Sequence, residues 1–174
     1  VIHHYRPSLN PLTRWLRNLT RWRTLRILSD IQPSNGGFLE ATPLTSFVTM
    51  SLAAGGLANH SVTLKGIEFL VRSVQDNGSW PIDSNLSTWL TTLSINAMPA
   101  QLDFGDRQRL RAWLLAQQFR SQHPYTNAAP GGWAWTDLPG GVPDSDDTAG
   151  ALVALYNLGD IDATVRSAAL AGIR

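Results

Sequence analysis

The stretch KGIEFLVRSVQDNGSW, residues 65–80, shows the pattern that organises the chain: an apolar helical run that ends in Gln, Gly and an aromatic residue. The same ending recurs as QPSNGGF at 32–38 and, with an insertion, as QFRSQHPYTNAAPGGWAW at 118–135. The three turns start at glutamines spaced by 43 residues: Gln32, Gln75 and Gln118. A period of this length predicts a repeat protein.

Each repeat contains two segments with apolar residues at helical spacing, such as Ile67, Leu70, Val71 and Val74. No Asn-Gly or Asp-Gly pair joins two alternating runs, so no β-hairpin is predicted. The pairs Asn35-Gly36 and Asn77-Gly78 link helical patterns instead. We expect helices near residues 12–29, 43–54, 62–75, 86–98, 106–119, 147–157 and 162–172.

Two-helix units of about 40 residues build either open solenoids or closed double rings of helices. The regular Gly-aromatic turns favour the ring, so the predicted fold class is all-α, as part of an (α/α) barrel, or toroid. Such a ring needs about twelve helices, and seven are expected here. The chain starts at Val1, and its last apolar pattern reaches Arg174, so we expect roughly half of a ring from a longer protein.

The composition suits a globular domain, with 43% apolar residues and a net charge of +1. No run of 18 apolar residues occurs, so no transmembrane helix is expected. The absence of cysteine excludes disulfides and thiolate metal sites. We expect two parts: a basic helical segment over residues 1–30 and an incomplete α/α-barrel domain over 31–174.

Residues 1–30 hold six of the 14 basic residues and a single acid, Asp30. The basic residues are Arg6, Arg14, Arg17, Arg21, Arg23 and Arg26, interleaved with Trp15 and Trp22. Such a helix either packs on the domain with a solvated basic face or lies on an anionic membrane surface. Nucleic-acid binding is disfavoured, because the rest of the chain has 8 basic and 12 acidic residues.

The stretch GGVPDSDDTAGALVAL, residues 140–155, places three of the 13 acids at the start of an apolar helix: Asp144, Asp146 and Asp147. One explanation is helix capping, which Asp performs well. The positions aligned with these acids are Thr42, Leu44 and Thr45 in the first repeat and Ser84, Leu86 and Ser87 in the second. We expect hydroxyls to cap those two helices without charge, so three acids exceed what a cap requires.

A calcium loop is a second explanation for the acids. Its pattern requires Gly at the sixth position and Glu at the twelfth. Those positions are occupied by Ala149 and Leu155, so the pattern disfavours calcium.

The quoted motifs resemble a known family. KGIEFLVRSVQDNGSW resembles the QW repeat of the squalene–hopene and oxidosqualene cyclases, although Phe69 lies one residue too far from Gln75. PGGWAWTDLPGGVPDSDDTAGAL, residues 130–152, resembles the segment that carries their Asp-x-Asp-Asp-Thr-Ala motif. The resemblance covers most of residues 31–174 and implies cyclisation of a linear polyprene, such as squalene, that starts by protonation, without metal or organic cofactor.

The resemblance also implies roles for individual residues. Asp146 is the implied proton donor, flanked by Asp144 and Asp147. Trp133 and Trp135 lie in the loop that leads to the acids, where aromatic faces can stabilise a carbocation, so with Thr148 they are expected to line the substrate cavity. The chemistry agrees, because an alkene is a very poor base and needs an acid that is still protonated near neutral pH. Carboxylates a few ångströms apart cannot all ionise cheaply, so the cluster retains a proton.

The expected partners are a polyprenyl hydrocarbon and, through the basic segment, a membrane surface on its cytoplasmic side. Two alternatives stay open. A class II diterpene cyclase shares an Asp-x-Asp-Asp acid but takes a diphosphate substrate, and the QW-like repeats favour the first function. A helical ring without catalytic activity, used for binding, is the alternative from another class. Prenyltransferase activity with zinc is disfavoured because the chain lacks cysteine.

Overall fold

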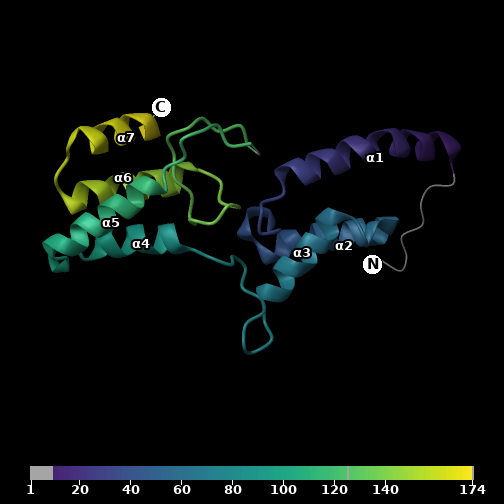
Figure 1. The fold of residues 1–174 in the computed structure, drawn as a ribbon, viewed down its shortest axis with the longest axis horizontal. Helices are drawn as coiled ribbons and strands as arrows, with labels where there is room; N and C mark the ends of the chain where they lie inside the picture. Colours follow the sequence, from purple (N-terminus) through teal and green to yellow (C-terminus); the bar gives the residue numbers. More distant parts are fainter. Residues whose placement is uncertain (1–9, 125, 174) are drawn as a thin grey trace. The chain divides into compact units, whose positions relative to one another are not determined.

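The structure is a computed structural model that describes residues 10–124 and 126–173. Within those ranges it is all-α, and the predicted fold class is confirmed at that level. Arg6 of the basic segment lies outside the described residues. The helices, shown in Figure 1, are α1 (Pro11–Ile31), α2 (Thr42–Leu52), α3 (Ser61–Arg72), α4 (Ser87–Ala97), α5 (Phe104–Ala116), α6 (Ser145–Leu158) and α7 (Ala163–Ile173).

All seven expected helices are present, with ends that differ by up to three residues from the expected ranges. Side-chain caps explain several of the starts. The side chains of Asn10, His60, Asp103 and Asp144 accept backbone N–H groups in the first turns of α1, α3, α5 and α6. Helix α6 ends at Gly159, whose φ of 79° is readily adopted only by glycine.

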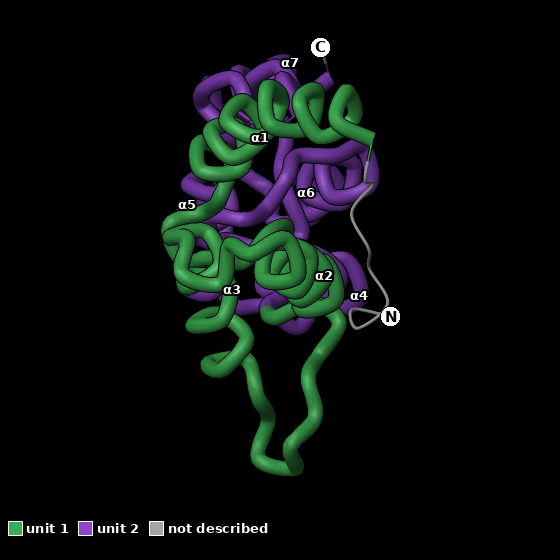
Figure 2. Tube along the Cα trace, turned by 90° about the vertical axis from the view of Figure 1, so that its right-hand side faces the viewer, with its two compact units in different colours: residues 1–84 green, residues 85–174 purple. Residues whose placement is uncertain are grey.

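The chain divides into two compact units, Val1–Ser84 and Asn85–Arg174 (Figure 2). Helix α1 belongs to the first unit, together with α2 and α3. The boundary predicted after residue 30 stays a prediction.

The first unit is built on close packing of α2 against α3. Gly66 of α3 lies against Thr49 of α2, where a Cβ on residue 66 would come within 2.4 Å of the Thr49 hydroxyl. The buried apolar residues described in this unit are Leu25, Phe38, Val62 and Phe69.

Glu40 is a fully buried carboxylate in the first unit that no sequence motif indicates. Its oxygens accept hydrogen bonds from the Asn35 amide at 2.7 and 3.0 Å and from the Ser84 hydroxyl at 3.0 Å. Its own carbonyl accepts the N–H of Ser84 at 2.8 Å. Glu40 therefore ties the turn before α2 to the segment that precedes α4, which is a structural task.

The second unit is centred on α6, which contacts α4, α5 and α7. Its core is formed by Ile95, Leu114, Trp133, Ala151, Ala154, Leu155, Leu158, Val165 and Ala168. Helices α4 and α6 pack together although α5 separates them in the sequence. This contact is the one expected of alternating helix layers, whereas closure into a toroid stays a prediction.

The sequence repeat corresponds to a repeated hydrogen-bond pattern. The Gln118 amide donates to the carbonyls of Gly131 at 2.7 Å and Ala168 at 2.8 Å. In the first repeat the Gln32 amide donates in the same way to Gly36 at 3.1 Å and Val62 at 3.0 Å. Each glutamine thus joins the end of its own helix to its turn and to the second helix that follows it, α3 for Gln32 and α7 for Gln118.

The glycines of these two turns are required by close backbone approach. A Cβ on Gly131 would lie 2.2 Å from the carbonyl oxygen of Ala171, and a Cβ on Gly36 would lie 2.3 Å from that of Lys65. Both glycines also have positive φ, 124° and 90°.

The middle turn differs from the other two. Gln75 bonds within its own turn, since its N–H donates to the Ser79 carbonyl at 2.9 Å and its Oε1 accepts from the Ser79 hydroxyl at 3.0 Å. The Trp80 indole donates to the Leu70 carbonyl at 2.8 Å. Gln75 and Trp80 therefore tie the end of α3 to this turn.

Candidate acid site

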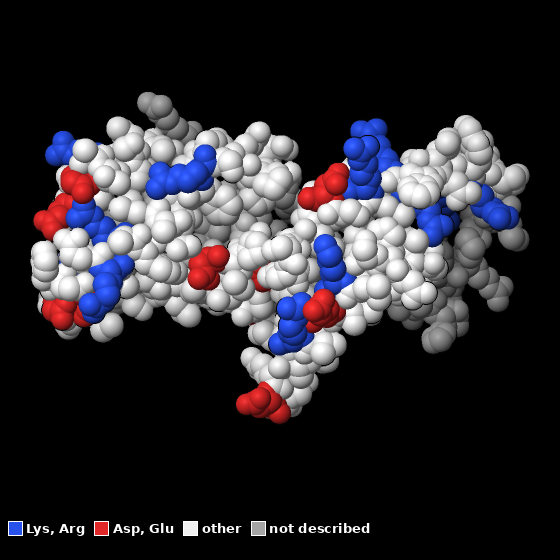
Figure 3. Space-filling view, in the orientation of Figure 1, with Lys and Arg blue, Asp and Glu red and all other residues white. Residues whose placement is uncertain are grey.

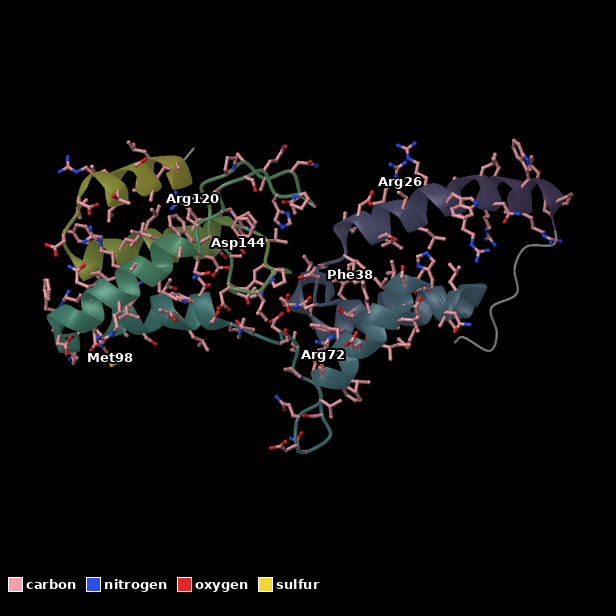
Figure 4. All side chains as sticks on the ribbon, viewed as in Figure 1. Arg26, Phe38, Arg72, Met98, Arg120 and Asp144 are labelled. Carbon is pink, nitrogen blue, oxygen red and sulfur yellow. The ribbon has the colours of Figure 1, made fainter. Side chains whose placement is uncertain are left out.

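The three clustered aspartates lie at the N-terminus of α6, as the sequence predicts. Asp144 is the N-cap residue, and its Oδ1 accepts the backbone N–H of Asp147 at 2.8 Å. Asp146 and Asp147 are in the first turn of the helix. Figure 4 labels Asp144 at this end of α6. The capping explanation is therefore correct for Asp144, and it leaves two further acids to be explained.

The three acids differ in burial. Asp147 is only 6% exposed, whereas Asp144 and Asp146 are exposed. Neighbouring residues on a helix point about 100° apart, so Asp146 and Asp147 cannot occupy the same environment. The structure therefore separates a buried acid from the exposed acid that the resemblance assigns as donor.

Burial and neighbouring charge raise the pKa of Asp147 from 3.8 to about 7. Removal from water is the largest cause, because it disfavours the ionised form. The negative charge of Asp144, a side-chain hydrogen bond with Asp144 and the charge of Asp146 act in the same direction. The cluster therefore retains a proton near neutral pH, as its spacing in the sequence suggested.

Thr148 fastens the aromatic turn to the start of α6. Its hydroxyl accepts the backbone N–H of Trp133 at 3.0 Å and donates to the carbonyl of Asp144. The N–H of Asp144 in turn donates to the Trp133 carbonyl at 3.2 Å. Asp144 is therefore held at its cap position by a backbone bond to the aromatic turn and by the Thr148 hydroxyl of α6.

Trp133 lies inside the core of the second unit and is fully buried. Its indole N–H donates to the carbonyl of Leu114 in α5 at 2.7 Å. This placement gives Trp133 a packing role and does not favour it as a wall of a substrate cavity.

Trp135 is half-buried, and its carbonyl accepts the backbone N–H of Trp89 at 3.0 Å. Its indole nitrogen is buried and has no hydrogen-bond partner among the described residues. Trp135 remains a candidate for the cavity, whose extent stays a prediction.

A pocket of about 420 Å³ adjoins the acid site, between the start of α6, the aromatic turn and the end of α7. Its walls come from small or apolar residues and one carboxylate: Ala128, Ala129, Pro130, Gly132, Pro143, Asp144, Ser145, Thr148, Ala149, Leu152, Ala171 and Gly172. Of the predicted site residues, Asp144 and Thr148 line this pocket.

The structure corrects the alignment of the first repeat with the acid motif. The Thr45 hydroxyl accepts the N–H of Phe38 at 2.9 Å and donates to the carbonyl of Ala41 at 2.8 Å, as the Thr148 hydroxyl does with Trp133 and Asp144. Thr45 is therefore the counterpart of Thr148. The three acids then correspond to Ala41, Pro43 and Leu44, one residue before the positions expected, and these too are uncharged.

The expectation that hydroxyls cap the other two helices was wrong. The N-cap residues of α2 and α4 are Ala41 and Leu86, and neither makes a side-chain cap bond. Helix α6 is thus the one of these three that begins with a charged cap. The repeat architecture therefore forms its helices without acids at this position.

Among residues 10–124 and 126–173, no group of three His, Cys, Asp or Glu side chains is placed to hold a metal ion. In the same part of the chain, no helix combines the length and the apolar character needed to cross a membrane.

No protein-family model matches the chain, and no curated protein matches it.

Proposed function

We propose that the acid cluster of α6 starts the cyclisation of a linear polyprene by protonating its terminal alkene, with Asp146 as the group that delivers the proton. The proton passes from a carboxyl group to an alkene carbon, which leaves a carboxylate and a carbocation. The carbocation is then attacked by the next double bond of the same substrate. No metal or organic cofactor is needed for this step.

The observation that carries the proposal is the raised pKa of Asp147, about 7, inside a cluster of three acids. The proton belongs to the cluster as a whole. Asp147 is buried and suited to retain it, whereas Asp146 is exposed at the helix end and open to a substrate. The N-terminus of α6 stabilises the carboxylate that remains, because its dipole favours negative charge.

The uncharged counterparts in the first repeat support a functional origin for the acids. Ala41, Pro43 and Leu44 stand in the same places, and α2 forms without any acid there. Since burying a carboxylate costs stability, a group kept at such a cost is more readily explained by chemistry than by folding.

The experiment uses the full-length protein with squalene in detergent and measures cyclised product by mass spectrometry. Asp146→Asn removes the acidic proton at nearly constant shape, and we expect turnover to fall about a thousandfold or more. Asp76→Asn, the same substitution at an exposed acid of the first unit, is the matched control and is expected to keep normal turnover. Near-normal turnover by Asp146→Asn would contradict the proposed donor.

The same assay separates the alternatives. A class II diterpene cyclase would convert geranylgeranyl diphosphate and leave squalene unchanged. A helical ring that only binds its ligand would yield no cyclised product from either substrate. Substitution of the three acids would then change no measured turnover.

We also propose that the chain works at a membrane surface, on the cytoplasmic side, because a polyprene hydrocarbon dissolves in the bilayer. The support is the arginine-rich helix α1 with its two tryptophans. Vesicle co-sedimentation of the full-length protein tests this part of the proposal.

A further inference from the structure

Helix α1 has one face of exposed apolar side chains. At 3.6 residues per turn, Leu12, Trp15, Leu16, Leu19 and Trp22 fall within about 120° of its circumference. All five are exposed, and Trp22 is 81% exposed. We call these five residues the tryptophan face of α1.

The rest of the first unit contacts α1 on another side. Leu25, at 8% exposure, is the buried residue of the helix, and Leu28 and Ile31 are half-buried. All three lie outside the sector of the tryptophan face. Helix α1 contacts α3, so the helix is held by one side while the described residues of the first unit leave the tryptophan face uncovered.

The arginines of α1 divide between the two sides. Arg23 and Arg26 lie in the angular sector of the tryptophan face, near its C-terminal end, whereas Arg14 and Arg21 lie on the side of Leu28. Figure 3 shows basic side chains over α1, and in Figure 4 Arg26 points away from α2 and α3. Asp30, the one acid of the helix, approaches Arg26 only to 4.0 Å, with both side chains exposed.

We propose that α1 lies on an anionic lipid surface through its tryptophan face, with Arg23 and Arg26 contacting lipid phosphates. This inference rests on the proposal that the chain works at a membrane, and it is independent of the acid site. Tryptophan rings settle at the level of the headgroups, where leucines reach the acyl chains and arginines meet phosphate.

Charge favours lipid over a second copy of the chain. Helix α1 carries five arginines against one acid, so two such helices packed face to face would repel. An anionic surface instead attracts each arginine close to it.

The test compares two charge-matched variants of the full-length protein. R23Q/R26Q removes the two charges in the angular sector of the tryptophan face, and R14Q/R21Q removes two charges on the side of Leu28. Binding is measured by co-sedimentation with vesicles of phosphatidylcholine alone and of phosphatidylcholine mixed with phosphatidylglycerol. Circular dichroism checks that both variants keep their helix content.

We expect the wild-type protein to bind the mixed vesicles more tightly than phosphatidylcholine alone. R23Q/R26Q should lose about tenfold or more in affinity for the mixed vesicles, and R14Q/R21Q much less, because only charges near the surface contribute fully. W15A/W22A should weaken binding to a similar degree as R23Q/R26Q. Squalene turnover in detergent should be unchanged in all three variants.

Three results would overturn the inference. Failure of the wild-type protein to bind mixed vesicles would remove the membrane proposal as well, while the cyclisation assay would still decide the acid site. Equal losses in the two arginine variants would leave membrane association standing and remove the proposed orientation. Conversion of an oligomer to a monomer by W15A/W22A, without vesicle binding by the wild type, would assign the face to a second copy.

Discussion

Asp144 caps α6 by accepting the N–H of Asp147 at 2.8 Å, and its negative charge also lies beside the buried Asp147 carboxyl. One side chain therefore stabilises the helix and hinders ionisation of its neighbour. The two effects can be separated experimentally, because an amide can cap a helix without carrying charge.

Asp147→Asn should stabilise the protein in a pH-dependent way. The pKa of Asp147 is raised to about 7 in the folded state, so the folded protein binds a proton more tightly than the unfolded chain. Ionisation therefore costs stability as the pH rises from about 4 to about 7. Urea unfolding at pH 8 should show a gain of no more than about 4 kcal/mol, which shrinks towards zero below pH 4. A gain of equal size at both pH values would contradict the raised pKa.

Substitutions of Asp144 should distinguish its charge from its cap. Both Asp144→Asn and Asp144→Ala remove the neighbouring charge and should lower the pKa of Asp147 towards its ordinary value, as measured by carboxyl NMR titration. Asp144→Ala should also lose about 1 kcal/mol of stability with the cap, whereas Asp144→Asn should keep most of it. An unchanged pKa of Asp147 in both variants would show that burial and the charge of Asp146 raise it without Asp144.

Three threonine-to-valine substitutions should differ in their cost. Thr148→Val and Thr45→Val leave the buried N–H groups of Trp133 and Phe38 without an acceptor, at a cost of about 1–3 kcal/mol each. The buried hydroxyl of Thr88 has no partner among the described residues, and Pro81, which stands 43 residues after Phe38, has no N–H to donate. Thr88→Val should therefore leave the free energy of unfolding, measured by chemical denaturation, unchanged or increased. A loss comparable to that of Thr148→Val would show that the Thr88 hydroxyl makes a stabilising hydrogen bond.

Glutamine-to-glutamate substitutions should show how much the amide hydrogen bonds of Gln32 and Gln118 contribute to stability compared with those of Gln75 in the middle turn. Gln118→Glu replaces a buried amide that donates to two carbonyls with a group that cannot donate when ionised, so several kcal/mol should be lost. Gln32→Glu should lose somewhat less, because Gln32 is only half-buried. Gln75→Glu, on an exposed side chain, should stay within about 0.5 kcal/mol. Thermal melts of the three variants check the order, and equal losses would refute it.

The sequence predicted the existence and type of all seven helices, because apolar residues at helical spacing and Gly-containing turns are local signals. It also located the acids at a helix start, since Asp before an apolar run is typical of an N-cap. It did not indicate Glu40, whose burial depends on Asn35 and the distant Ser84.

The one-residue error in aligning the first repeat has a clear origin. Thr45 follows its partner Phe38 by seven residues, whereas the loop after Trp133 places Thr148 fifteen residues after its partner. Only the paired hydrogen bonds of Thr45 and Thr148 show which positions correspond. An insertion changes the number of residues between the turn and the helix, but the hydrogen bonds between the turn and the helix stay the same.

The sequence by itself determined the repeat, the helices and the presence of three acids at the start of α6, since these follow from residue types at short spacing. Only the tertiary structure decided that Asp147 is buried while Asp146 is exposed, and that Trp133 belongs to the core. Burial and the pKa shift that follows from it depend on how the aromatic turn, α5 and α6 pack together, and those contacts join residues far apart in the chain.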